Sequence, residues 1–245
     1  MTLQSRTQHP WLSWIMRHRA RAALFVFGSL LPLLAFAEIA EDLVEHQAFS
    51  YDVPVLQALH GFAHAGYDHI MIVLSIIGYG WGIVPLDIAV GLWFAFRRRF
   101  MLLGFWAASV GGAAALNVGA KMLFGRTRPD LWESIAPEST LSFPSGHAMG
   151  SMAAMAALVV LLWPTRWRWS MVIFAVVFVF GVGLSRVYLG VHYPSDVLAG
   201  WMAALGWVIG VTNVFWGKLS VEPPADVKGP VEPAPKPVDT HARNA

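Results

Sequence analysis

The chain has 245 residues, of which 56% are hydrophobic and only 13% charged, and its formal net charge at pH 7 is +2. An average soluble domain carries about 25% charged residues, so this composition indicates a membrane protein. The small net charge and the lack of a long basic tract argue against nucleic acid as a partner. The absence of cysteine excludes disulfides, zinc–thiolate sites, iron–sulfur clusters and thiol nucleophiles in this chain.

A basic N-terminal segment, residues 1–21, precedes an uncharged apolar run over 22–37. The run ends in Ala35-Phe36-Ala37, which resembles a signal-peptidase site. We favour an uncleaved first membrane span, because the leading segment is long for a signal peptide. In both alternatives the basic flank stays inside and the chain from Glu38 onward emerges outside.

The next segment, residues 38–68, is mixed and acidic. Between Val53 and His64 apolar residues recur at helical spacing, which predicts a helix with one apolar face along the outer membrane interface. The histidines in and beside this segment lack the carboxylate spacing of a metal site, so we interpret them as surface or interfacial residues. They are His46, His60, His64 and His69.

Five further apolar runs are predicted to be membrane-spanning, since a helix crosses a ~30 Å hydrocarbon core with about 20 apolar residues. The run Ile70–Phe96 contains a glycine-rich break at 78–82 and is expected to be kinked. It also contains Asp87, for which we favour a structural role, such as an ion pair with Arg97, over a functional one. The other runs cover 100–120, about 145–164, about 169–184 and about 194–216.

The last segment, residues 218–245, carries six prolines and is predicted to be a disordered cytoplasmic tail without chemistry. The bias of Lys and Arg towards the inner face places both termini inside. Four basic residues near span ends then lie on the disfavoured outer face, which implies an anionic ligand there. They are Lys121, Arg126, Arg128 and Arg186. The predicted fold is an all-α, polytopic membrane bundle of six transmembrane helices over 22–217, with an active site at the outer, periplasmic face.

Positive charges converge on this face from three different segments, because Lys121, Arg128 and Arg186 follow or end different predicted spans. A phosphoryl group in transfer spreads negative charge over its equatorial oxygens, so catalysis is largely positioning and electrostatic stabilisation. The guanidinium fork of arginine matches phosphate oxygens, and lysine acts as a point charge. The charge pattern therefore predicts a phosphate site.

The sequence Pro144-Ser145-Gly146-His147 opens the fourth predicted span. Free backbone N–H groups at this helix N-terminus are expected to point at the same phosphate. Gly146 allows a close approach of the backbone, and Ser145 adds a hydroxyl donor.

Two histidines complete the predicted site. His192 precedes Asp196 by four residues, so in helical geometry their side chains face each other. A carboxylate in that position orients the imidazole and stabilises its charged form. His192 is therefore the candidate nucleophile, forming a phosphohistidine, and His147 is the candidate acid that protonates the leaving oxygen and then activates water.

These clusters resemble the three-part signature of the type 2 phosphatidic acid phosphatase superfamily. The matching patterns are Lys121-x6-Arg128-Pro129, Pro144-Ser145-Gly146-His147, and Ser185-Arg186-x5-His192-x3-Asp196. Order and spacing agree over residues 121–196, with no departure at the motif positions. The resemblance implies metal-independent dephosphorylation without a cofactor, through a phosphohistidine at His192, with His147 as acid and base and Asp196 as the partner of the nucleophile. It assigns phosphate binding to Lys121, Arg128, Arg186, Ser145 and Gly146.

The hypothesis is a lipid phosphatase or pyrophosphatase of the bacterial inner membrane that requires no protein partner. By resemblance its substrates are polyprenyl diphosphates such as undecaprenyl diphosphate, phosphatidic acid or phosphatidylglycerol phosphate. Two alternatives stay open. A lipid phosphotransferase would use an acceptor lipid in place of water, and a non-catalytic lipid-binding or flipping protein would keep the cleft without turnover.

Two polar residues near the motifs have open roles. Arg126 is not demanded by the motif and either touches substrate or faces solvent. Asn117, one turn before Lys121, either orients that lysine or forms a hydrogen bond between helices. The small-residue runs 111–115 and 148–157 are predicted to be helix packing surfaces.

Overall fold

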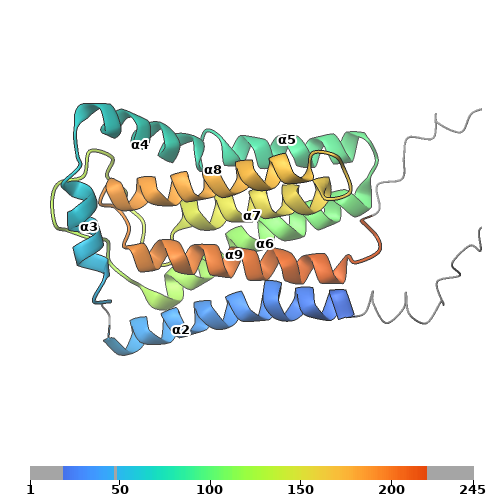
Figure 1. Ribbon diagram of the computed structural model, residues 1–245, viewed down its shortest axis with the longest axis horizontal. Coiled ribbons are helices and arrows are strands. Elements are labelled where there is room, and N and C mark those ends of the chain that lie inside the picture. The colour runs from blue at the N-terminus through green and yellow to red at the C-terminus, as the bar shows by residue number, and fades with distance from the viewer. Residues whose placement is uncertain (1–18, 47–48, 220–245) are drawn as a thin grey trace, which may run out of the picture.

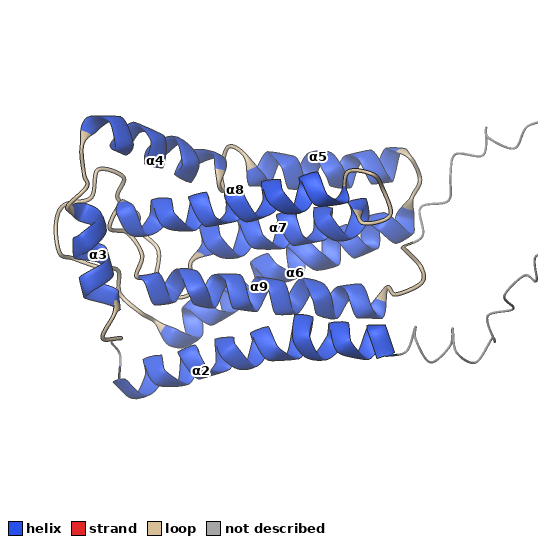
Figure 2. Ribbon diagram, viewed as in Figure 1, coloured by secondary structure: helices blue, strands red, loops and turns tan. Residues whose placement is uncertain are grey.

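A computed structural model describes residues 19–46 and 49–219 of the chain. Within these ranges the chain forms helices joined by loops, with no strand (Figure 2). The predictions for residues 1–18 and for the tail from 220 onward lie outside the described residues. The elements are η1 (Leu24–Leu30), α2 (Leu31–His46), α3 (Asp52–His60), α4 (Ala65–Ile77), α5 (Ile83–Phe96), α6 (Phe100–Phe124), α7 (Gly146–Leu162), α8 (Arg168–Tyr188) and α9 (Pro194–Val214).

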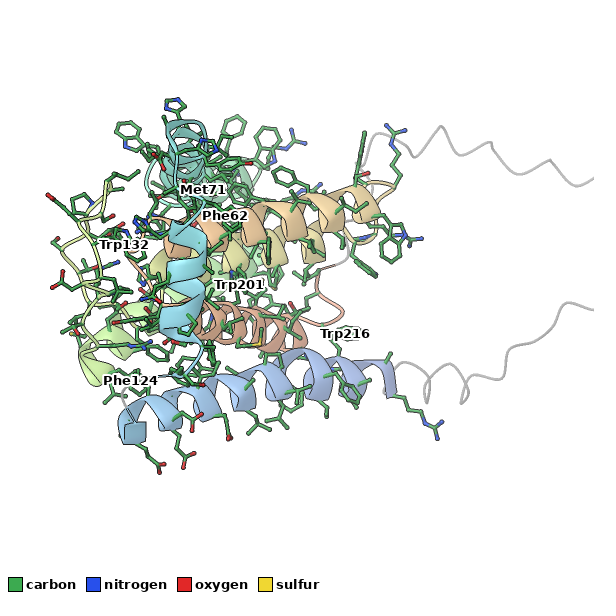
Figure 3. All side chains as sticks on the ribbon, turned by 60° about the vertical axis from the view of Figure 1, so that its left-hand side comes forward. Phe62, Met71, Phe124, Trp132, Trp201 and Trp216 are labelled. Atoms are coloured by element: carbon green, nitrogen blue, oxygen red, sulfur yellow. The ribbon has the colours of Figure 1, made fainter. Side chains whose placement is uncertain are left out.

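The long helices lie side by side in an elongated bundle, and the short helix α3 crosses one end of it (Figure 1). The loops from α6 to α7 and from α8 to α9 lie at this α3 end. The loops from α5 to α6 and from α7 to α8 lie at the opposite end, where the described chain also begins and ends. Figure 3 places Trp132 and Phe124 at the α3 end and Trp216 at the other.

Four of the described helices are long and apolar enough to cross a membrane. They cover Arg19–Glu45, Phe100–Phe124, Arg168–Tyr188 and Pro194–Val214. The helices α4, α5 and α7 are apolar but shorter. Many large apolar side chains on these helices are exposed at the surface of the bundle, which suits contact with lipid rather than water. The chain is an integral membrane protein.

Several helices extend beyond the apolar runs that predicted them. The helix predicted over 100–120 continues to Phe124, so Lys121 lies in its last turn, and Gly125 ends it with a left-handed φ of 60°. The helix predicted to end near residue 184 continues to Tyr188 and includes Arg186. A hydropathy pattern ends at the first polar residue, whereas the backbone hydrogen bonds of a helix continue to its cap.

The predicted kinked span is two helices, α4 and α5, separated by residues 78–82. The ion pair suggested between Asp87 and Arg97 is absent. Arg97 lies about 15 Å further along the helix axis at 1.5 Å per residue, and its guanidinium instead lies 5.5 Å from the ring centroid of Trp93. One carboxylate oxygen of Asp87 is buried without a hydrogen-bond partner among the described residues.

The helix predicted over Val53–His64 is shorter in the structure and ends at His60. Its apolar face is partly confirmed, because Leu56 is completely buried, but Phe62 lies beyond the helix and is 66% exposed. The first helical residue, Asp52, is only 1% exposed, which is unusual for a carboxylate.

Helix α7 lies at the centre of the bundle and packs against α6, α8 and α9. Small residues at such an interface let helix backbones approach closely. The predicted packing surface over 148–157 is confirmed by its buried alanines, Ala148, Ala153, Ala154 and Ala157.

Candidate active site

The residues of the three motifs meet at the α3 end of the bundle. The loop over 125–145 and the turn over 189–193 connect the helix ends here. His192 lies in the turn and is only 1% exposed. The motif residues are thus carried by four helix ends and two loops, which explains why they are scattered in sequence.

The imidazole of His192 lies between a carboxylate and a guanidinium. Its Nδ1 is 3.3 Å from Oδ2 of Asp196, and its Nε2 is 3.1 Å from Nη1 of Arg128. A guanidinium has donors but no acceptor, so Nε2 accepts this hydrogen bond and the ring proton lies on Nδ1, facing Asp196. The unprotonated Nε2 therefore faces the cationic side of the site.

Burial holds the pKa of His192 well below its usual range, at about 4. The hydrogen bond and negative charge of Asp196 offset part of this effect, whereas the charges of Arg128 and Arg186 add to it. His192 is consequently neutral near pH 7, which is the form that a nitrogen nucleophile requires.

Asp196 is completely buried in the first turn of α9. Its Oδ2 accepts hydrogen bonds from the hydroxyl of Ser142, at 2.5 Å, and from the backbone N–H of Tyr193, at 2.9 Å. These donors hold the carboxylate against His192. The motif pattern did not identify Ser142, whose one sequence signal is its place just before Pro144-Ser145-Gly146-His147.

Arg128 is fixed mainly by backbone carbonyls. Its Nε donates to the carbonyl of Thr140 at 2.6 Å, and its Nη1 donates to the carbonyl of Val191 at 2.7 Å. Its Nη2 donates to the hydroxyl of Thr140 at 2.9 Å. Partial burial lowers the pKa of Arg128 from its very high ordinary value, which leaves the group charged at any pH near neutrality. The guanidinium is therefore a fixed positive charge beside Nε2 of His192.

The other two cations come from helices. Arg186 of α8 is 1% exposed, and its Nη1 donates to the hydroxyl of Ser75 on α4. Its buried Nε has no hydrogen-bond partner among the described residues, so one donor is unused. Lys121 of α6 donates to the carbonyl of Leu141 and lies close enough to Arg128 and Arg186 for their charges to interact.

A carboxylate that sequence reasoning missed lies among these cations. Oε1 of Glu138 is 2.5 Å from Nη2 of Arg186 and 4.0 Å from Nε2 of His147. Its Oε2 is 3.6 Å from Nη2 of Arg128. Glu138 thus occupies an anion-binding position, and no spacing rule could have found it, because it lies in an irregular loop.

The first turn of α7 contributes the remaining predicted residues. Ser145 is completely buried and caps the helix, with its hydroxyl 3.5 Å from the N–H of Ala148. An added Cβ at Gly146 would lie 3.2 Å from Oδ1 of Asn117, so a side chain would be crowded here. The ring of His147 lies 5.0 Å from that of Tyr79 and 34° from parallel to it.

Two residues with open roles now have definite contacts. Asn117 donates to the carbonyl of Pro144 at 3.1 Å, so it links α6 to the start of α7 and does not orient Lys121. Arg126 is buried, so the expectation that it faces solvent is wrong. It is 8% exposed and bonds to Asp196 and Asp52 behind the histidine, because the left-handed turn at Gly125 ends α6 and redirects the chain inward.

Among the described residues no group of three or more His, Cys, Asp or Glu side chains is arranged to hold a metal ion. The positive charge at the site comes instead from lysine and arginine. Together with a neutral, buried histidine, this set of groups suits a reaction at a phosphate.

Comparison with known proteins agrees with this chemistry. Residues 101–220 match the family model of the PAP2 superfamily. The chain is 32% identical over 182 residues to phosphatidylglycerophosphatase B of Bacillus subtilis, covering 70% of this chain and 87% of that protein. It is 30% identical over 190 residues to an undecaprenyl-diphosphatase of Sulfolobus acidocaldarius, covering 75% of this chain and 88% of the relative.

A solved structure is also similar. The transmembrane PAP2-type phosphatidylglycerolphosphate phosphatase from Bacillus subtilis superposes with a TM-score of 0.66 at 28% identity, covering 76% of this chain and 94% of that one. The fold is that of a membrane-embedded phosphatase, and the protein is a hydrolase that acts on phosphoric ester bonds. The chain belongs to the PAP2 superfamily, which confirms the resemblance inferred from its three motifs.

Proposed function

We propose that this protein removes a phosphate from a membrane lipid by transferring the phosphoryl group first to Nε2 of His192 and then to water. The observation that carries the proposal is the placement of His192. Its proton-bearing nitrogen faces Asp196, and its free nitrogen faces the guanidinium of Arg128.

In the first half-reaction Nε2 of His192 attacks phosphorus while the bond from phosphorus to the lipid oxygen breaks. The bonding electron pair leaves with that oxygen, which takes a proton from His147. Arg128, Arg186 and Lys121 stabilise the charge on the equatorial oxygens, and the unused Nε of Arg186 supplies a donor. Glu138 gives up its anion position as the phosphate enters.

In the second half-reaction the neutral His147 removes a proton from water, and the water oxygen attacks the phosphorus of the phosphohistidine. The nitrogen–phosphorus bond breaks and its electron pair returns to Nε2 of His192. Asp196 stabilises the positive charge that the phosphorylated imidazole carries between the two steps. Inorganic phosphate is the product.

The mechanism requires no metal ion in our proposal. Three basic side chains supply the positive charge that a divalent cation supplies in many phosphoryl-transfer enzymes. Activity in the presence of EDTA is therefore expected.

We propose six membrane crossings within one domain over 22–217. The four long helices supply four, α7 a fifth, and α4 with α5 together the sixth. The loops after α5 and α7 carry Arg97–Arg99 and Arg166, and α8 begins at Arg168. These residues lie at the end where the described chain begins and ends. The positive-inside bias then puts both termini in the cytoplasm and the site at the outer face of the bacterial inner membrane.

The proposed substrate is a lipid monophosphate or diphosphate that reaches the site from the bilayer. Named relatives include a phosphatidylglycerophosphatase, an undecaprenyl-diphosphatase and a decaprenylphosphoryl-5-phosphoribose phosphatase. Phosphatidylglycerol phosphate, undecaprenyl diphosphate and phosphatidic acid are accordingly the first candidates.

The test is a phosphate-release assay on purified protein in detergent with EDTA, across a panel of these lipids. We expect release from at least one lipid, and loss of that release in His192→Ala. Equal turnover by His192→Ala would overturn the mechanism. Transfer of labelled phosphate to a second lipid, without free phosphate, would instead favour a phosphotransferase.

A further inference from the structure

Arg126 lies on the side of Asp196 that faces away from the reacting histidine. Its Nη1 donates to Oδ1 of Asp196 at 2.6 Å, and its Nη2 donates to Oδ2 of Asp52 at 2.8 Å. Because His192 contacts Oδ2 of Asp196, the two oxygens of this carboxylate serve different partners. Arg126 therefore holds Asp196 from behind without occupying the site itself.

Asp52 accepts hydrogen bonds from Ser195 as well as from Arg126. Its Oδ1 accepts the backbone N–H of Ser195 at 3.0 Å, and its Oδ2 accepts the hydroxyl of Ser195 at 2.6 Å. That hydroxyl also accepts a hydrogen bond from Nη1 of Arg126 at 2.8 Å. The guanidinium of Arg126 covers the ring of Tyr193, with Cζ 4.1 Å from the ring centroid.

These groups form a closed, buried network that joins α3 to the first turn of α9. The side chains of Asp52 and Asp196 are at most 2% exposed, and that of Arg126 is 7% exposed. Buried charges are costly unless they are paired and fully hydrogen-bonded, so three of them in one network need a reason beyond helix packing.

The charges of the network provide that reason. Two carboxylates and one guanidinium leave one net negative charge beside a neutral His192. This excess is balanced when the imidazole becomes positive on phosphorylation. Without Asp52 the pair of Arg126 and Asp196 would be neutral, and the positive imidazole would be less stable.

We propose that Arg126 and Asp52 are positioning residues for the reaction, which fix the orientation of Asp196 and set the negative potential that it presents to His192. The inference rests on the proposed phosphatase function and extends it to α3. An outer helix that carries none of the three motifs thereby becomes part of the catalytic apparatus.

Several other titratable or charged groups lie near the pair of His192 and Asp196. They are Arg128 and Glu138 from the loop over 125–145, Lys121 from α6, His147 from α7 and Arg186 from α8. Variants of Arg126 and Asp52 leave all of these groups in place, so a change in the titration of His192 reports on the network.

The experiment compares the acid limb of the pH profile of kcat/KM for wild type, Asp52→Asn and Arg126→Gln. Removing the negative charge of Asp52 disfavours protonated His192. The acid limb of Asp52→Asn is therefore expected to move to lower pH, by about one unit. Removing the positive charge of Arg126 has the opposite sign and moves the limb to higher pH. We expect kcat to fall by roughly 10- to 100-fold in both variants, with KM nearly unchanged, because Asp196 is displaced but phosphate binding is not.

Two further variants keep the result interpretable. Asp68→Asn is the matched control, because Asp68 is another carboxylate at the α3 end, accepting a hydrogen bond from the hydroxyl of Tyr188 at 2.7 Å, outside the network. It is expected to keep the wild-type kcat and acid limb. The double variant Asp52→Asn/Arg126→Gln is expected to have an acid limb between those of the single variants, since the two charge changes have opposite signs and partly cancel.

The inference is overturned if the limb of Asp52→Asn does not lie below that of Arg126→Gln, or if KM rises as much as kcat falls. If Arg126→Gln does not fold, Asp52→Asn is compared with wild type, and the inference is overturned if its acid limb does not lie at lower pH than that of wild type. A wild-type protein without phosphatase activity would overturn the proposed function itself. An active wild type with unshifted variants would overturn only the role of the network.

Discussion

Oε1 of Glu138 lies 2.5 Å from Nη2 of Arg186, a group expected to bind phosphate. The same carboxylate is near Arg128 and His147, so a residue of the protein itself fills the anion position. We expect a phosphate that enters the site to replace this carboxylate, so that Glu138 competes with substrate.

Replacing Glu138 by Gln is expected to strengthen anion binding, because it removes the internal competitor and keeps the side-chain shape. Glu138 is partly exposed, so the pair is worth about 1 kcal/mol, or roughly a fivefold decrease in the inhibition constant of inorganic phosphate. The inhibition constant is measured by competition in the phosphate-release assay. Glu133→Gln, an exposed glutamate of the same loop, is the control and should bind phosphate like wild type. Weaker phosphate binding in Glu138→Gln would contradict this prediction and show that the carboxylate helps phosphate to bind.

The low pKa of His192 predicts activity that persists into mildly acidic solution. The nucleophile is the neutral form, which is present above the pKa of about 4 and is lost as the pH falls below it. The acid limb of kcat/KM should therefore lie near pH 4, with a tenfold loss per unit below it, as roughly expected for one essential base.

The lipid phosphate also titrates, with a second pKa of about 6, so the profile is measured with both a monoester and a diphosphate. An acid limb at the same pH with both substrates reports the titration of a group on the enzyme. An enzyme limb near pH 6.5, the value of an ordinary histidine, would contradict the account of a desolvated nucleophile.

Asp196→Asn is expected to reduce kcat strongly. The amide group of asparagine would donate to Nδ1 of His192, which moves the ring proton to Nε2 and removes the nucleophilic lone pair. The corresponding change in a serine-protease triad costs about 10⁴-fold in kcat, and a loss on that order is expected here.

Ser142→Ala is the companion variant, since it deletes the 2.5 Å hydrogen bond to Asp196 but keeps the carboxylate. Its kcat should fall far less, by about tenfold, which corresponds to one hydrogen bond of about 1.4 kcal/mol. Equal kcat values for the two variants would refute the assigned role of the carboxylate.

Two adjacent glycines of α6 test the packing of the bundle. A Cβ on Gly112 would lie 2.5 Å from the indole of Trp207 on α9, whereas a Cβ on Gly111 would meet no atom within 4 Å. Gly112→Ala is expected to destabilise the protein by about 1–3 kcal/mol through overpacking. Gly111→Ala should be neutral or stabilising by up to about 1 kcal/mol, because alanine favours helix. Thermal unfolding in detergent measures both, and equal stabilities would contradict the close contact between α6 and α9.

The sequence predicted those parts of the molecule that depend on local patterns. Apolar runs located the helices, and Ser145 marked the start of α7 because its side chain is a helix cap. Fixed spacing also brought His192 and Asp196 together, since the two residues are only four positions apart. Helix ends were less accurate, because Lys121 and Arg186 are polar but still helical.

The groups that the sequence did not reveal act through contacts between distant segments. Asp52 precedes Asp196 by more than half of the chain, and neither residue has a pattern that refers to the other. Glu138 lies in a loop without periodicity. Such contacts depend on how the helices pack, which motif spacing does not encode.

The most direct test of the central claim is to trap the phosphoenzyme. The purified protein is mixed with a lipid phosphate labelled on phosphorus, quenched in base during turnover, digested and mapped by mass spectrometry. We predict an acid-labile, base-stable phosphate on His192, absent from His192→Ala and from protein without substrate. Turnover with no phosphorylated residue, or with the phosphate on a residue other than His192, would contradict it.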